Sequence, residues 1–299
     1  YTDGNRMKFT DGVEQALLKR DLPIITYYDF FVLGHSLFQQ REWDGEPLKR
    51  MPHGWDQTRA NNAIKRMEER RALVADSDFR SGVWRVTQAT RAGTAEEVVC
   101  IADPFAYVSH LSAMQRYSLT ERSPKALHVT TPRRDIWNQL RNDRVRNDLP
   151  EIEGIDKPVL YRPGFKDTIR RRPVIMHISS HPWTPAPLSG EETRITSIGQ
   201  TFADMITEPG LCGGMRHVLD VWERDADQWL PEIVAAVDQL NSKIAKVRAG
   251  YILSEVLELD DPAIARWEAF AQRGGSRKLD PEADYLPEFS ERWMISLNV

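Results

Sequence analysis

Residues 55–86 read WDQTRANNAIKRMEERRALVADSDFRSGVWRV, and this stretch decides how the N-terminal part of the chain is interpreted. At 100° per residue, one side of a helix collects the small and apolar positions, namely Ala60, Ala63, Ile64, Met67 and the stem of Arg71. Asp56 precedes these positions and is well placed to cap the helix. The pattern predicts an amphipathic helix with one buried face.

The opposite face of this helix carries side chains that suit DNA recognition. Asn and Gln pair with adenine, Arg pairs with guanine, and Lys acts as a point charge near phosphates. A charged outer face is also typical of an ordinary solvated helix, and Glu68 and Glu69 would repel phosphate. On the DNA-binding interpretation, we expect major-groove contacts from Gln57, Thr58, Arg59, Asn62, Lys65 and Arg66.

The segments around this helix favour DNA binding. Two short strand-like runs, 72–75 and 83–87, flank a polar loop at 76–82 and predict a hairpin. Two further helices are expected upstream, over 11–19 and 26–40. Three helices followed by a hairpin is the order of a winged helix, whose third helix enters the major groove. We therefore expect contacts to the DNA backbone from the hairpin residues Arg80, Ser81 and Arg85.

Length and composition indicate a folded protein of two domains. The chain has 299 residues, of which 41% are hydrophobic, and single cores stop growing at about 250 to 300 residues. No apolar run approaches the roughly 18 residues of a membrane span, and residues 1–12 show no signal pattern. Cys100 and Cys212 have no CxxC partner, so neither a disulfide framework nor a structural metal site is expected. We expect a cytoplasmic protein without a cofactor.

Charge is unevenly distributed along the chain. The formal net charge is −1 over residues 1–110, +6 over 111–180 and −9 over 181–299. Two interpretations remain open for the basic middle: a solvated face balanced by the acidic last third, or a second phosphate-binding surface that extends the winged-helix footprint. The side chains that produce the positive excess are Arg133, Arg134, Arg141, Arg144, Arg146, Lys166, Arg170, Arg171 and Arg172.

Beyond residue 90 the pattern changes to mixed helix and strand. A linker-like Arg-Ala-Gly-Thr run at 91–94 predicts a domain boundary close to residue 90. Strand-like runs occur at 98–101, 127–131, 159–162, 174–179 and 194–197, helices are expected over 107–117 and 135–147, and helical patterns dominate after residue 200. The predicted fold is α+β, with a winged helix over 1–90 and a mixed α/β domain with a helical end over 91–299.

No catalytic motif stands out in the sequence. His177 and His181 lie on a predicted strand, where four residues separate two rings by about 13 Å. Asp167, Glu191 and Glu192 have no lysine at a supporting spacing and are interpreted as surface acids. We expect a protein that is not an enzyme. The alternatives are a metal-dependent nuclease or RNA-modifying enzyme in the C-terminal domain, and an adaptor whose winged helix binds a protein.

Four blocks after the linker resemble, in order and spacing, those of the AbiEi-type antitoxin family of type IV toxin-antitoxin and abortive-infection systems. They are AYVSHLSAMQRYSLTE (106–121), LHVTT (127–131), ITSIGQTFADMITEPGLCGG (195–214) and VRAGYILSEV (247–256). The long mycobacterial MenA-type members are the most similar. The resemblance implies a winged-helix repressor that binds inverted repeats in double-stranded operator DNA ahead of its own operon. It also implies a C-terminal domain that counters a nucleotidyltransferase-type toxin.

Overall fold

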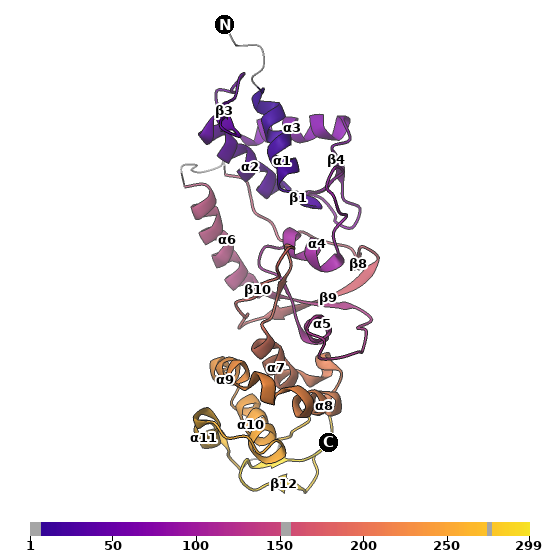
Figure 1. The fold of residues 1–299 in the computed structure, drawn as a ribbon, viewed down its shortest axis with the longest axis vertical. Coiled ribbons are helices and arrows are strands. Elements are labelled where there is room, and N and C mark those ends of the chain that lie inside the picture. Colours follow the sequence, from indigo (N-terminus) through magenta and orange to yellow (C-terminus); the bar gives the residue numbers. More distant parts are fainter. Residues whose placement is uncertain (1–6, 151–156, 274–276) are drawn as a thin grey trace.

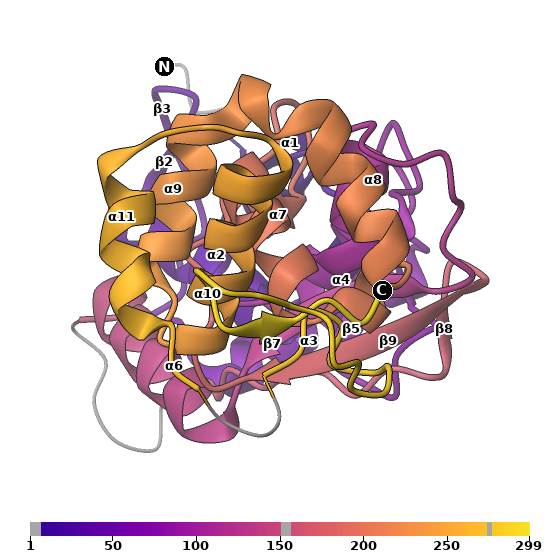
Figure 2. The ribbon, with the colours of Figure 1, turned by 90° about the horizontal axis from the view of Figure 1, so that it is seen from below.

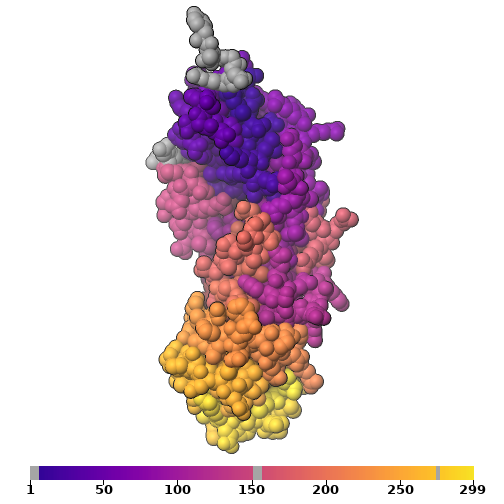
Figure 3. All heavy atoms as spheres, in the orientation of Figure 1, coloured from indigo at the N-terminus to yellow at the C-terminus, as the bar shows by residue number. Residues whose placement is uncertain are grey.

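The chain folds into an elongated molecule in which helices and strands are mixed, so the expected α+β class is confirmed at this level. The computed structural model describes residues 7–150, 157–273 and 277–299. N-terminal elements lie at one end, C-terminal elements lie at the other, and a sheet lies between them (Figure 1). The same succession is visible in the space-filling view (Figure 3). Among the described residues, every helix is too short or too polar to cross a membrane.

The N-terminal section contains three helices and a small antiparallel sheet of strands β1, β5 and β4, in that order. The expected helix at 57–69 and the expected hairpin are both present, and the Asp56 carboxylate caps the helix by accepting the Arg59 N–H at 2.8 Å. The elements are α1 (Phe9–Lys19), β1 (Ile24–Thr26), α2 (Tyr27–Gln40), β2 (Glu42–Trp43), β3 (Glu46–Pro47), α3 (Gln57–Glu69), β4 (Leu73–Ala75) and β5 (Val83–Val86).

Trp55, directly before α3, is the centre of the N-terminal core. Its ring packs against Phe9, Phe30 and Phe31, with a centroid separation of 5.5 Å to Phe9, and its indole N–H donates to the Phe31 carbonyl at 2.9 Å. Gly34 of α2 leaves the space that the ring fills, because a Cβ at this position would lie 2.1 Å from Trp55. The ring therefore fixes how α2 and the start of α3 approach each other.

The middle section is a six-stranded sheet in the order β10-β11-β6-β7-β9-β8. Strands β7 and β9 run parallel and pair continuously from Leu127 opposite Val174 to Pro132 opposite Ser179. Their carboxyl ends therefore meet at one edge of the sheet. The elements are α4 (Ala95–Ala102), β6 (Tyr107–Val108), α5 (His110–Arg116), β7 (Leu127–Pro132), α6 (Arg134–Asp148), β8 (Thr168–Ile169), β9 (Arg172–Ser179), β10 (Ala186–Pro187) and β11 (Arg194–Ile195).

Three predictions for the middle section were wrong. Residues 98–101 belong to helix α4, because the Thr94 hydroxyl caps the helix by accepting the Glu97 N–H at 3.2 Å. This cap and the burial of the valines among core residues outweigh the preference of β-branched side chains for strands. The helix expected over 107–117 begins only at residue 110, after strand β6. Residues 159–162 form no strand.

The C-terminal section is helical, as expected, and closes on a two-stranded ladder. Its core contains Trp222, Trp267 and Trp293, all fully buried. Figure 2 looks onto this end of the molecule, with α10 between α11 and α8. The elements are α7 (Ile198–Thr207), α8 (Met215–Asp225), α9 (Leu230–Gln239), α10 (Lys243–Tyr251), α11 (Pro262–Trp267), β12 (Phe289–Ser290) and β13 (Ile295–Ser296).

The hydrophobic cores do not divide at residue 90. The N-terminal core includes Trp137, Leu149 and Leu160, which come from the chain after the linker. The core of the middle section includes Ile24 and Phe79, which precede the linker. The predicted boundary thus separates elements along the chain, but elements on its two sides share hydrophobic cores.

Replacing Gly34 with Ala should destabilise the N-terminal core, because the new methyl group would overlap the Trp55 ring. We expect a loss of about 1 to 3 kcal/mol in the free energy of unfolding, the usual range for overpacking. Urea denaturation followed by tryptophan fluorescence measures it. Gly54→Ala is the matched control, since a Cβ there meets nothing within 4 Å. Equal losses for both variants would contradict this account of the core.

Candidate nucleic-acid interface

Helix α3 presents a polar face to solvent, as the sequence predicted. Thr58, Arg59, Asn62, Lys65 and Arg66 are all exposed, whereas the core-facing positions of the helix are buried. Among the described residues, Lys65 and Arg66 have no acidic side chain within ion-pair distance, so both cations remain available to a polyanion. Lys65 and Arg66 can therefore meet a duplex without first breaking an internal ion pair.

The first turn of α3 is more constrained than its sequence indicates. Arg59 is ion-paired with Asp56, the capping residue. Gln57 is half-buried, and its amide donates to the Lys157 carbonyl at 3.4 Å. The Gln57 carbonyl accepts the Tyr27 hydroxyl, also at 3.4 Å. Gln57 thus lies against the protein's own chain, and the exposed face begins one residue later than predicted.

A groove of about 600 Å³ joins α3 to the hairpin loop, residues 76–82 between β4 and β5. Gln57 and Asn61 line it from α3, Arg80 and Ser81 line it from the hairpin loop, and Tyr161 lines it from a segment far along the chain. The helix and the hairpin loop consequently lie side by side, and Arg80 and Ser81 are exposed. Sequence reasoning missed Tyr161, whose side chain is 68% exposed, because no local pattern relates it to α3.

The hairpin loop is held by residues of the middle section. Phe79 forms an isolated antiparallel bridge with Phe165. On either side of this bridge, the Arg80 N–H donates to the Gly164 carbonyl and the Lys166 N–H donates to the Asp78 carbonyl, both at 2.9 Å. The loop is therefore attached to the sheet of the middle section and does not project as a free tip.

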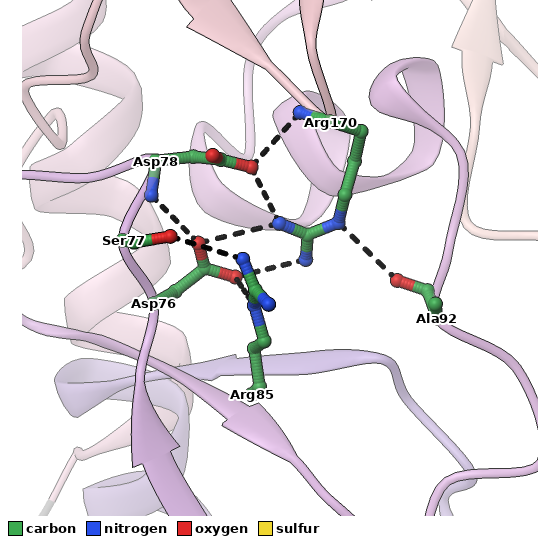
Figure 4. Close-up of polar contacts among 6 residues, drawn as sticks. All are labelled: Asp76, Ser77, Asp78, Arg85, Ala92 and Arg170. Carbon is green, nitrogen blue, oxygen red and sulfur yellow. Dashed lines mark hydrogen bonds and ion pairs between the residues drawn. The ribbon is translucent and has the colours of Figure 1, made fainter.

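Arg170 completes this attachment, in what we call the Arg170 cluster: Arg170 with Asp76, Ser77, Asp78, Arg85 and Ala92 (Figure 4). Its guanidinium donates to Asp76 Oδ2 at 2.8 Å, to Asp78 Oδ2 at 2.6 Å and to the Ala92 carbonyl at 3.4 Å. Its backbone N–H also donates to Asp78 Oδ2, at 2.9 Å. One side chain thus joins the hairpin loop, the linker and the β8–β9 turn.

Asp76 is the buried anion of the cluster, with a fully buried side chain. Burial alone would raise the pKa of Asp76, but hydrogen bonds from Arg170, the Asp78 N–H and Arg85 lower it below its ordinary value. The Arg85 guanidinium donates to Asp76 Oδ2 at 3.1 Å and to the Ser77 hydroxyl at 3.2 Å. Arg85 therefore has an internal structural role, while its side chain stays 46% exposed and its contact to the DNA backbone remains a prediction.

The β8–β9 turn that supplies Arg170 has an unusual backbone. Arg170 and Arg171 both have positive φ, 51° and 64°, a conformation that tight hairpin turns usually assign to Asn and Gly. Non-glycine residues in this region are strained and persist only where surrounding contacts fix them. The hydrogen bonds and ion pairs of Arg170 hold its backbone in this conformation, whereas the side chain of Arg171 is exposed.

The basic residues of the middle section do not form one surface. Figures 1 and 2 both place α6 and β8, which carry or adjoin these arginines, at opposite edges of the molecule. Several of the cations are also paired internally. The pairs are Arg133 with Asp135, Arg144 with Asp29 and Asp148, Arg170 with Asp76 and Asp78, and Arg172 with Glu96. Arg141 donates to Asn142, and Arg134 and Arg171 are exposed. These residues therefore do not form one continuous second surface for nucleic acid.

Of the acidic residues considered for a nuclease, Glu191 already has partners for its carboxylate. Glu191 is ion-paired with Arg116 and accepts the Thr193 hydroxyl at 2.7 Å. The Glu192 N–H donates to Glu97 at 3.3 Å. Within the described ranges, no group of three or more His, Cys, Asp or Glu residues is arranged to hold a metal ion.

Comparison with known proteins gives little further information. No family model matches the chain, and no curated protein matches it. Among solved structures, the crystal structure of the RV2827C protein from Mycobacterium tuberculosis aligns over 97% of this chain and 92% of that one. The TM-score is 0.44 and the sequence identity is 12%, which is too low to bear on fold or function.

Replacing Arg170 with Ala should release the hairpin loop, because Asp76 would keep a buried charge with Arg85 as its one cationic partner. Breaking a buried ion pair from one side costs about 3 kcal/mol or more. We expect this loss in the free energy of unfolding, together with faster hydrogen exchange at the amides of Arg80 and Lys166. Arg171→Ala is the control, since Arg171 shares the positive φ but lies outside the cluster. An equal effect of the two substitutions would show that turn strain, and not the cluster, holds the loop.

Proposed function

We propose that residues 7–90 form a winged helix that binds double-stranded DNA, and that the protein is a transcriptional regulator. The element order α1-β1-α2-β2-β3-α3-β4-β5 and the sheet order β1-β5-β4 support this proposal. In a winged helix, the third helix enters the major groove and the hairpin contacts the flanking backbone.

The observation that carries the proposal is the groove that α3 and the hairpin loop line together. Asn61 of α3 and Ser81 of the loop line the same groove, and the neighbouring face of α3 bears cations without internal partners. An ordinary solvated helix would not require a hairpin loop fixed at its side. In the proposed complex, Asn62 contacts base edges, and Lys65, Arg66 and Arg80 contact phosphates.

The resemblance to AbiEi-type antitoxins extends the proposal to a specific regulatory role. On this view the protein represses its own operon by occupying inverted repeats, and its C-terminal section counters a nucleotidyltransferase-type toxin. Gel-shift titration on the DNA upstream of its own gene tests the first part. Co-expression with the product of the neighbouring gene, followed by growth measurement, tests the second.

Replacing Lys65 or Arg66 with Ala should weaken binding to this DNA by about 1 to 3 kcal/mol each, because each change removes an exposed cation from the α3 face. A residue that contacts phosphate should also lower the slope of log affinity against log salt by about 1. Fluorescence anisotropy over a salt series measures both quantities.

Arg292→Ala is the control for net charge, since Arg292 lies between β12 and β13, and β12 lies at the opposite end of the molecule from α3 (Figure 1). If all three variants bind with the same affinity as the wild type, α3 is not the DNA-binding face. If the protein shifts no DNA but co-purifies with the toxin, the winged helix is a protein-binding adaptor.

A further inference from the structure

Three histidines that are far apart in the sequence meet in the middle section. His110 begins α5, His128 lies on β7 and His177 lies on β9. The His177 ring is 4.7 Å from that of His110 and 5.2 Å from that of His128, measured between centroids. His128 Nδ1 and His177 Nε2 are 2.9 Å apart, so one proton lies between these two rings. None of these contacts concerns α3 or the hairpin loop.

His110 is held rigidly in this group. Its ring nitrogens contact Ser109 Oγ at 2.8 Å and Glu208 Oε2 at 3.0 Å, and its backbone has a positive φ of 52°. Burial lowers the pKa of His110, but the hydrogen bond that its ring donates to Glu208 and the charges of Asp204 and Glu208 raise it above the ordinary value. The same hydrogen bond lowers the pKa of Glu208, so each residue favours the charged form of the other.

A cavity of about 510 Å³ opens beside these histidines. It lies at the carboxyl ends of β7 and β9, between Thr130, His177 and the last turn of α7. Crevices outside the carboxyl ends of parallel strands are where α/β sheets commonly bind ligands. A concave site with a few converging polar groups is the usual form of a small-molecule site.

Asp204 of α7 determines the charge of this cavity. Its Oδ1 accepts the Trp183 indole N–H at 2.9 Å, whereas Oδ2 is buried and has no hydrogen-bond partner among the described residues. A buried carboxylate oxygen without a donor is costly, so its retention indicates that a donor arrives from outside. No Lys or Arg is among the described residues that line the cavity. Glu208 is hydrogen-bonded to His110. Burial raises the pKa of Asp204, so a cation in the cavity would stabilise the charged form of its carboxylate.

We propose that this cavity binds a small organic cation with several N–H donors, a guanidinium or amidinium compound, and that Asp204 is its anionic anchor. Such a ligand supplies the donor that Oδ2 lacks and the positive charge that the lining lacks. The side chains of Thr130, Ser179 and Asn241 offer further oxygen acceptors, and Trp183 offers an aromatic ring that suits a planar cation. An anion would find no Lys or Arg among the described residues of the lining.

The experiment compares methylguanidinium with N-methylurea, which has the same shape without the charge, and with inorganic phosphate. Each is titrated into the full-length protein while the imidazole signals of His110 and His177 are followed by NMR. We expect methylguanidinium to shift both signals, with no comparable shift from the other two. Asp204→Asn keeps an oxygen acceptor for Trp183 and should weaken methylguanidinium binding roughly tenfold or more, the effect of about 1.4 kcal/mol.

Asp220→Asn is the control variant, because it removes one exposed carboxylate from α8, outside the cavity. Equal affinity for methylguanidinium and N-methylurea, or preferential binding of phosphate, would overturn the proposal. An equal loss in the two variants would do the same. The comparison of probes uses the wild-type protein, so it decides the question even if Asp204→Asn does not fold.

Discussion

The buried carboxylate of Asp76 is the constraint on which the arrangement of the N-terminal and middle sections depends. A charge without solvent must be matched by charge and hydrogen bonds, and Asp76 obtains them from Arg85 on its own hairpin and Arg170 on a different sheet. The position of the hairpin loop is thus set by residues nearly a hundred positions later in the chain. If the N-terminal section binds DNA as proposed, the middle section is part of the binding device, because it fixes the loop beside α3.

Local patterns in the sequence were sufficient to predict the helices and the hairpin of much of the N-terminal section. The period of Ala60, Ile64 and Met67 located α3 and its buried face, and Asp56 located its start. The polar run at 76–82 located the hairpin loop. These features are set by neighbours along the chain, which is why propensity and periodicity could find them. The same approach failed at 98–101, where a cap and burial in a core outweighed the β-branched side chains.

The charged residues could not be interpreted in this way. Arg85, Arg144, Arg170 and Arg172 looked like available cations, and each has an acidic partner in the fold. Most of these partners lie dozens of residues away, so no spacing rule connects them. Conversely, Lys65 and Arg66 were predicted as DNA contacts on the same kind of evidence and have no acidic partner among the described residues. For a charged side chain, the structure separates an internal role from an external one, and the sequence does not.

The histidine-lined cavity and the hairpin loop are linked by one strand, β9, with Arg170 just before its start and His177 near its end. A ligand in the cavity could alter DNA binding only by moving this strand. Six residues of β9 pair with β7, and the strand's start is also paired with β8. Pairing on both sides opposes a shift of β9, and coupling between sites is carried by elements that have two discrete arrangements. The pairing of β9 therefore favours independent action of the two proposed sites.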